Sequence, residues 1–97
     1  MSFVQIMQLQ TSKADELRAA ADKWDKATEG KRTIQRSVMC QDRDQPGRYF
    51  IVVYFDSYEE AMKNSTLPET EALAKKTVAL SDSPPIFYNL DVLEERQ

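Results

Sequence analysis

The 97-residue sequence contains no histidine and only one cysteine, Cys40. Histidine is the most common general base near neutral pH, so its absence excludes the Ser–His and Cys–His nucleophile pairs. Imidazole and thiolate are also the usual ligands of zinc, haem iron and iron–sulfur clusters. The acidic residues form no calcium-binding loop. We therefore predict no metal and no cofactor, and the sequence singles out no catalytic residue.

The single cysteine excludes an internal disulfide, which favours a reducing compartment, most simply the cytoplasm. Cys40 lies in a predicted strand, where we interpret it as a buried, inert thiol rather than a nucleophile. The first residues lack a basic segment followed by an apolar one, so we expect no targeting segment.

Long apolar runs and a strong excess of charge are missing as well. No stretch approaches the roughly 20 apolar residues of a membrane span. The chain has 13 basic and 16 acidic residues and a net charge of −3, with no long run of either sign. A basic surface for the phosphates of nucleic acid is therefore not expected. We predict a protein that binds neither membranes nor nucleic acid.

The segment from Ser12 to about Gly30 has the pattern of an amphipathic helix. Ser12 is a suitable N-cap, and Asp15 and Glu16 follow in the first turn, where acidic groups favour the positive end of the helix dipole. Gly30 is predicted to adopt the left-handed conformation after the helix ends. The apolar stripe of this helix contains Leu17, Ala20, Ala21, Trp24 and Ala27.

A second helical region is predicted in two pieces. The first begins at Ser57, whose hydroxyl caps it, and the second at Thr66, followed by Pro68, which a helix tolerates in its first turn. A Ser-Pro-Pro run at 83–85 ends the second piece. The stripe of that piece contains Thr70, Leu73, Ala74, Thr77 and Leu80.

Four segments rich in β-branched and aromatic residues are predicted strands. They span residues 3–9, 32–41, 48–55 and 86–93, with a turn between the second and the third. Right-handed crossovers in the order βαββαβ give a four-stranded antiparallel sheet with the helices on one face. The sequence therefore predicts a ferredoxin-like α+β fold, in a single domain from residue 1 to 97.

The predicted sheet carries apolar residues on both faces. The strand 48–55 is apolar or aromatic at every position after Arg48, and the first and last strands also place apolar side chains on both sides. The helices cover one face, so the other face needs a cover of its own. A second copy of the chain provides one, which predicts a homodimer that forms a dimeric α/β barrel. A monomer with a spare aromatic face is the alternative.

With these elements the chain resembles the antibiotic-biosynthesis-monooxygenase-like domains of the dimeric α/β-barrel superfamily. The resemblance rests on strands 3–9 and 49–55, on the junction 55–62 (FDSYEEAM) and on the helix start 67–70 (LPET). Members include cofactor-independent oxygenases of polycyclic phenols, haem-degrading enzymes and small isomerases. The resemblance implies a cavity between helices and sheet for a small apolar or aromatic molecule. The haem-degrading branch uses a histidine in the second helical region, and residues 69–80 contain none.

Six residues are candidates for binding a substrate there: Trp24, Arg36, Tyr54, Tyr58, Met62 and Asn64. Trp24 either reaches the cavity or fills the layer between helix and sheet. Arg36 is predicted to share a strand face with Ile34 and Val38, where a buried guanidinium requires a carboxylate or a ligand. An internal ion pair, a contact to Asp91 across the dimer and a substrate anchor are the alternatives for Arg36.

The tyrosines and Asn64 also have two interpretations each. Tyr54, Tyr58 and Tyr88 either orient a phenolic substrate or pack in the dimer core. Asn64 either presents its amide at the mouth of the cavity or caps the frayed end of its helix.

Two functions are compatible with this sequence. One is a cofactor-independent monooxygenase, in which the protein orients an electron-rich aromatic that itself reacts with O₂. The other is a non-catalytic dimeric module that binds a small ligand or serves assembly, which accounts for the missing histidine base. A third function that the resemblance allows is that of an isomerase or lyase of the same superfamily.

Overall fold

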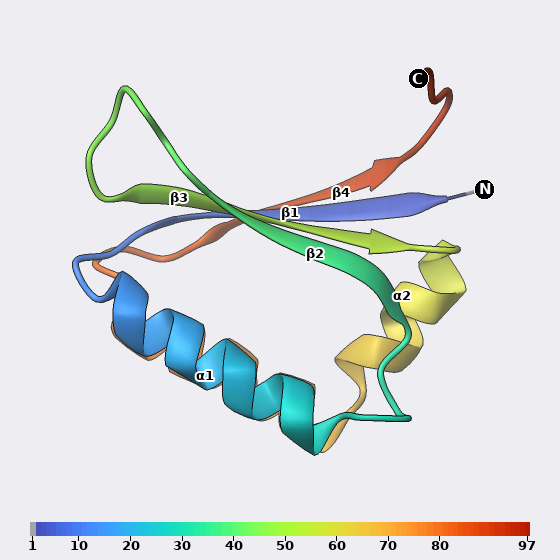
Figure 1. The fold of residues 1–97 in the computed structure, drawn as a ribbon, viewed down its shortest axis with the longest axis horizontal. Coiled ribbons are helices and arrows are strands. Elements are labelled where there is room, and N and C mark those ends of the chain that lie inside the picture. Colours follow the sequence, from blue (N-terminus) through green and yellow to red (C-terminus); the bar gives the residue numbers. More distant parts are fainter. Residues whose placement is uncertain (1) are drawn as a thin grey trace.

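The elements of the chain follow the order β-α-β-β-α-α-β in a computed structural model that describes residues 2–97. They are β1 (Phe3–Gln10), α1 (Ala14–Ala27), β2 (Ile34–Gln41), β3 (Arg48–Phe55), α2 (Tyr58–Ser65), α3 (Pro68–Leu80) and β4 (Ile86–Asp91). The strands pair antiparallel in the order β2-β3-β1-β4, and the helices lie on one side of this sheet (Figure 1). The predicted ferredoxin-like α+β fold is confirmed.

The helical regions agree with the sequence at several predicted landmarks. Ser57 caps α2, because its hydroxyl oxygen accepts a hydrogen bond from the backbone N–H of Glu60 at 3.2 Å. Gly30 has a φ of +78°, which a residue with a Cβ rarely adopts. The second helical region breaks before Pro68, as predicted. None of the helices in residues 2–97 is long and apolar enough to cross a membrane.

Two other predicted caps are wrong. The N-cap of α1 is Lys13 rather than Ser12, and the Lys13 N–H bonds to the hydroxyl oxygen of Thr11. The N-cap of α3 is Leu67 rather than Thr66, whose hydroxyl donates to a carbonyl in the last turn of α2. The Thr11 hydroxyl thus bonds just before α1, and the Thr66 hydroxyl is engaged with α2, so within residues 2–97 neither α1 nor α3 has a side-chain cap hydrogen bond.

Two predicted strands are shorter than the sequence pattern indicated. β2 begins at Ile34 rather than Arg32, because the Arg32 N–H turns back to the carbonyl of Thr28 at 3.0 Å. β4 ends at Asp91 rather than at residue 93. The strand β3 has the predicted bounds.

A β-bulge interrupts β2 between Ile34 and Arg36. Ile34 pairs with Phe55 and Arg36 with Tyr54, so two steps along β2 match one step along β3. Ile34 consequently packs against the core, whereas Arg36 lies on the opposite face of the sheet with Val38. The prediction that Arg36 and Ile34 share a face is therefore wrong, since it assumed a regular strand.

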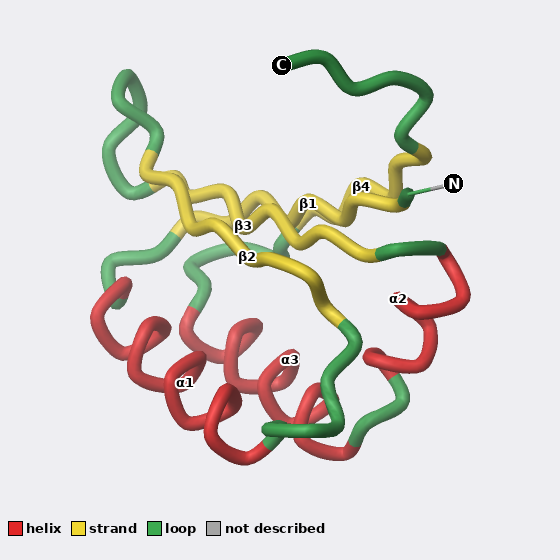
Figure 2. The backbone as a smooth tube through the Cα atoms, turned by 45° about the vertical axis from the view of Figure 1, so that its right-hand side comes forward, coloured by secondary structure: helices red, strands yellow, loops and turns green. Residues whose placement is uncertain are grey.

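The core lies between the sheet and the helices, in two clusters. The cluster near α2 contains Phe3, Phe55 and Ala61, with Ile34, Val53 and Met62 packed against it. The cluster near the start of α1 contains Leu9, Leu17 and Leu80, with Met7, Met39, Tyr49 and Ile51 packed against it. The helices α1 and α3 lie side by side on this side of the sheet (Figure 2).

The other side of the sheet, which we call the open face, carries no helix formed by residues 2–97 (Figure 2). The strand register places on it Val4, Ile6, Gln8, Arg36, Val38, Cys40, Phe50, Val52, Tyr54, Ile86, Tyr88 and Leu90. Cys40 is exposed, so the prediction of a buried thiol is wrong for the isolated chain. β2 is an edge strand, and nothing within residues 2–97 covers Cys40 on this face. The apolar residues on both faces of the sheet are as predicted.

Candidate functional site

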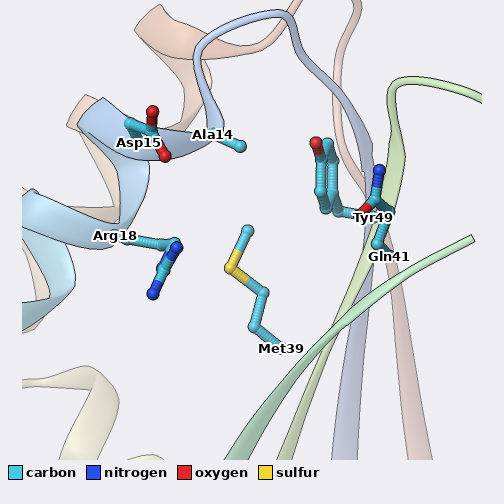
Figure 3. Close-up of a pocket in the computed structure, with 6 residues that line it drawn as sticks. All are labelled: Ala14, Asp15, Arg18, Met39, Gln41 and Tyr49. Atoms are coloured by element: carbon cyan, nitrogen blue, oxygen red, sulfur yellow. The ribbon is translucent and has the colours of Figure 1, made fainter.

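A pocket of about 470 Å³ lies between the start of α1 and the sheet (Figure 3). It is lined by Ala14, Asp15 and Arg18 of α1, Met39 and Gln41 of β2, and Tyr49 of β3. Pockets that bind small molecules have volumes of roughly 300–1,000 Å³. The pocket is therefore large enough for a small organic molecule, and it lies in the layer between helices and sheet.

Thr11 fixes the start of α1 above this end of the sheet. Its buried hydroxyl donates to the carbonyl of Leu80 at 2.6 Å and accepts from the N–H of Lys13 at 2.9 Å. One side chain thereby joins the end of β1, the first turn of α1 and the end of α3. This junction determines where the side chains of the first turns of α1 meet the sheet.

Helix and strand periodicity bring the lining residues together. Asp15 and Arg18 lie one turn apart and share a side of α1. Gln41 and Tyr49 are paired across β2 and β3, and Met39 lies on the same side of the sheet. The Met39 side chain reaches from the sheet into the space between Arg18 and Tyr49 (Figure 3). Three consecutive elements, α1, β2 and β3, thus supply one site.

The pocket has an apolar floor and a polar rim. Ala14, Met39 and Tyr49 are half-buried, whereas Asp15, Arg18 and Gln41 are exposed. The tyrosine ring and the thioether offer apolar contact, and the rim offers a cation, a carboxylate and an amide for hydrogen bonds. Such a set of groups suits a small aromatic molecule with polar substituents.

A second hollow, of about 590 Å³, is a groove between α1 and α3. Its lining combines Trp24, Leu73 and four alanines with the charged residues Glu16, Lys23, Glu69 and Lys76. Glu69 Oε2 accepts a hydrogen bond from Lys31 Nζ at 2.7 Å, and this bond lowers the pKa of the Glu69 carboxyl. Glu69 Oε1 is buried and has no hydrogen-bond partner among the described residues.

Asp42 is a second carboxyl group with a lowered pKa. The backbone N–H of Asp44 and the guanidinium of Arg48 bond to it and lower its pKa. Both Asp42 and Glu69 lie outside the pocket beside α1, and a lowered pKa makes a carboxylate a weaker base. Residues 2–97 contain no group of three or more cysteine and acidic side chains placed to hold a metal ion.

Trp24, one of the six predicted site residues, lies between the two long helices. It is 9% exposed, and its indole N–H donates to Thr70 Oγ1 at 2.9 Å. The guanidinium of Arg32 lies 5.9 Å from the ring centre. Trp24 therefore packs α1 against α3 and lines the groove between them, rather than the pocket over the sheet.

Arg36 and Tyr54 contact each other on the open face. The guanidinium carbon of Arg36 lies 4.2 Å from the centre of the Tyr54 ring, a cation–π geometry. Arg36 is exposed, and no carboxylate within residues 2–97 forms an ion pair with it. Asp91 pairs with Phe3 and so lies toward the helix side. Within one chain, Arg36 and Asp91 lie on opposite faces.

Tyr58, Met62 and Asn64 belong to α2, at the far end of the layer from the pocket. The Tyr58 ring meets Phe3 edge-on, with ring centres 5.4 Å apart. Met62 packs against the core cluster near α2. Asn64 is buried, and its Oδ1 accepts from the N–H of Thr33 at 3.4 Å, which fastens α2 to the start of β2.

The six predicted residues therefore lie in three separate places, and none of them lines the pocket beside α1. Their role in binding a substrate stays a prediction. Sequence reasoning missed the pocket residues Asp15, Arg18, Met39, Gln41 and Tyr49 as a group. The spacing of Asp15 and Arg18 along the helix and the alternation of faces along β3 are signals in the sequence that could have found part of this group. The register of β2 against β3 beyond the bulge brings the remaining residues into the pocket, and the sequence does not show that register.

Solved structures match this chain over nearly its whole length, although no protein-family model and no curated protein matches it. SnoaB from Streptomyces nogalater, a cofactor-independent oxygenase, superposes with a TM-score of 0.81 at 10% identity, over 97% of this chain and 95% of that chain. A candidate antibiotic biosynthesis monooxygenase from Deinococcus radiodurans gives 0.78 at 17% identity, over 98% and 96%. Rv0793 from Mycobacterium tuberculosis gives 0.80 at 15% identity, over 100% of both chains. At these identities the likeness shows the fold alone, and the chain has the ferredoxin-like fold that these proteins share.

Proposed function

We propose that this chain is a homodimeric, cytoplasmic oxygenase of the antibiotic-biosynthesis-monooxygenase type, which needs no cofactor and acts on a small aromatic molecule. The observation that carries the proposal is the pocket between α1 and the sheet, in a fold shared with a cofactor-independent oxygenase. Its half-buried ring and thioether suit an aromatic substrate, and its rim supplies polar groups that orient one.

The proposed reaction converts a CH₂ group between two aromatic rings, as in an anthrone, into a carbonyl. The CH₂ group first loses a proton and becomes a carbanion, which reacts with O₂. One oxygen atom forms the new C=O bond, and the other leaves as water with the two hydrogens of the CH₂ group. All electrons that reduce O₂ come from the substrate carbon, so the reaction balances without a flavin or a metal.

Three of the lining residues have a defined part in this proposal. Tyr49 and Met39 hold the aromatic ring on the side of the sheet. Asp15 is the carboxylate that lines the pocket, and we assign to it the uptake of the substrate proton. Positioning the carbanion and excluding part of the solvent are the remaining contributions of the protein.

The oxygenase proposal is tested by measuring oxygen consumption with an anthrone, which has the CH₂ group that the reaction requires. We expect a rate above the spontaneous oxidation in buffer, lost in Ala14→Phe, which fills the pocket, and kept in Ala79→Phe on the exposed surface of α3. Consumption no faster than in buffer would contradict the oxygenase. Ligand binding without oxygen consumption would instead support the non-catalytic binding module, which the absence of histidine favours.

The homodimer is supported by the open face, where apolar side chains of all four strands lie together. Ile86, Tyr88 and Leu90 are each more than two-fifths exposed there, and Val38 is 37% exposed. Contiguous apolar surface of this kind marks an interface in soluble proteins, and a two-fold axis covers it with a second copy. A partner seated there leaves the pocket free, because the pocket lies on the helix side.

Light scattering on a sizing column tests the dimer. Val52 lies in the middle of the open face, paired with Ile6 and Val38. Val52→Asp places an unpaired carboxylate in the interface, and we expect it to shift the chain to monomer. Val78→Asp makes the same exchange at an exposed position of α3 and should leave the dimer intact. A wild-type monomer, or equal behaviour of both variants, would rule the interface out.

A further inference from the structure

We infer that the molecule bound beside α1 carries one acidic group on its aromatic ring system, a carboxylate, and that Arg18 binds this group. The inference rests on the aromatic-binding part of the proposed function, since it concerns the same pocket. It adds a substrate class, the hydroxylated aromatic monoacids, and a specificity-determining residue.

Arg18 differs from the other arginines in lining the pocket without a partner. Within residues 2–97, no carboxylate lies within ion-pair distance of its guanidinium. Arg48 pairs with Asp42, Arg36 stacks on Tyr54, and Arg32 donates to the carbonyl of Asp25. Arg96 pairs with Glu94 in the C-terminal tail. The donors of Arg18 thus remain available at the edge of a hollow that an aromatic ring fits.

The guanidinium of Arg18 is suited to a carboxylate. Its planar fork donates two parallel hydrogen bonds to the two carboxylate oxygens, which a hydroxyl or a carbonyl oxygen cannot accept in the same way. Such a charge-assisted pair is roughly twice as strong as a hydrogen bond between neutral groups. A carboxylate held by Arg18 leaves the ring of the ligand over Met39 and in reach of Tyr49 (Figure 3).

The other polar groups of the pocket restrict the ligand to one acidic group. Asp15 lies one turn before Arg18 on the same side of α1, and its carboxylate repels a second anion. Gln41 and Tyr49, paired across the two strands, instead offer an amide and a hydroxyl that bind an uncharged hydroxyl of the ligand. The charge pattern therefore favours an aromatic with an acid at one end and hydroxyl groups at the other.

The test compares a hydroxynaphthoic acid with its methyl ester, which has the same ring and no charge. Binding is measured by calorimetry under nitrogen, so that turnover does not enter. We expect the acid to bind wild-type protein roughly tenfold more tightly than the ester. Arg18→Gln should abolish that preference, and Arg18→Lys should retain part of it, because an ammonium keeps the charge but not the fork.

Arg43→Gln is the matched control, since Arg43 is an exposed arginine of the hairpin loop and does not line the pocket. It should leave the preference for the acid unchanged. Equal binding of acid and ester by wild-type protein, no binding of either, or equal losses in Arg18→Gln and Arg43→Gln would overturn the inference. A preserved, Arg18-dependent preference without oxygen consumption would support the inference and contradict only the oxygenase.

Discussion

The two faces of the sheet differ in what covers them, although β3 supplies apolar side chains to both. On the helix side, Phe3 and Phe55 are 3% and 2% exposed. On the open face, Ile86 and Leu90 are 49% and 44% exposed. The difference comes from the helices, which all lie on one side (Figure 1).

This contrast separates two contributions to stability. Apolar area buried on the helix side stabilises the folded chain itself, whereas apolar area on the open face contributes only when something covers it. Substitutions on the two faces should therefore be detected by different measurements. The helix side determines the free energy of unfolding, and the open face determines how that free energy depends on protein concentration.

Replacing Phe55 by alanine should have the largest effect on stability. The side chain is almost fully buried against Phe3 and Ala61, and its loss leaves a cavity that costs about 3–5 kcal/mol of unfolding free energy. Urea denaturation measures the change. Phe87→Ala is the control on the same side of the sheet, where β4 is 51% exposed at this residue, and should cost less than about 1.5 kcal/mol. Similar losses of unfolding free energy in the two variants would contradict the expected difference between a buried and an exposed position.

Thr11→Val should be the next largest change. It keeps the volume of the side chain but removes the hydroxyl that joins β1, α1 and α3, leaving the carbonyl of Leu80 without its buried donor. We expect a loss of about 1–3 kcal/mol by chemical denaturation. Thr66→Val removes a hydroxyl with a similar bond at an exposed site and should change stability by about 0.5 kcal/mol or less. If the two valine variants behaved alike, the junction at Thr11 would have no special role.

The concentration dependence of the melting temperature should sharpen the contrast between the faces. For a dimer that unfolds to two monomers, a tenfold rise in concentration should raise Tm by roughly 3 °C. Calorimetric scans of wild type and Val52→Asp measure this shift. The variant should show none, whereas Phe55→Ala should lower Tm at every concentration and keep the shift. A Tm independent of concentration in the wild type would mean that the open face stays uncovered.

The smallest expected effects on stability concern its loss in acid. They involve one ion-paired carboxylate near each face of the sheet. The pKa of Asp42 is lowered by the backbone N–H of Asp44 and by Arg48, which lies beside Phe50 of the open face. The pKa of Glu69 is lowered by its hydrogen bond from Lys31. Because the folded state holds these groups ionised, their contribution is present above the ordinary carboxyl pKa and is lost as the pH falls below about 4. Asp42→Asn and Glu69→Gln should each flatten this acid loss of stability, measured by urea midpoints against pH. A slope unchanged in both variants would contradict the two assignments.

The sequence was sufficient for the fold, because the signals for it are local and repeated. The apolar run of β3, the capping serine of α2 and the break before Pro68 each follow from a few neighbouring residues. The predicted caps at Ser12 and Thr66 failed for the opposite reason. At the start of α1 the Thr11 hydroxyl, adjacent to Ser12, accepts the Lys13 N–H, and before α3 the Thr66 hydroxyl donates to a carbonyl of α2. Several polar groups of similar strength lie side by side at both places.

The candidate site could not be predicted from local signals. Met39 and Tyr49 come together through the pairing of two strands, and Arg18 joins them through the position of α1 over the sheet. The prediction followed the conspicuous residues instead, and Trp24 and Arg36 proved to contact Thr70 and Tyr54. Large aromatic and charged side chains find partners readily, so their presence alone is a weak indicator of a ligand.

The bulge in β2 allows Ile34 and Arg36, which are two positions apart, to lie on opposite faces of the sheet. Gln35 is the extra position, and its side chain donates to Asp56 just beyond the partner strand. A regular strand that kept Gln35 would place Ile34 on the face of Arg36, whereas deleting Gln35 would leave these two residues as neighbours on opposite faces. A bulge in an edge strand therefore accommodates one inserted residue while the core face and the assembly surface both keep their side chains.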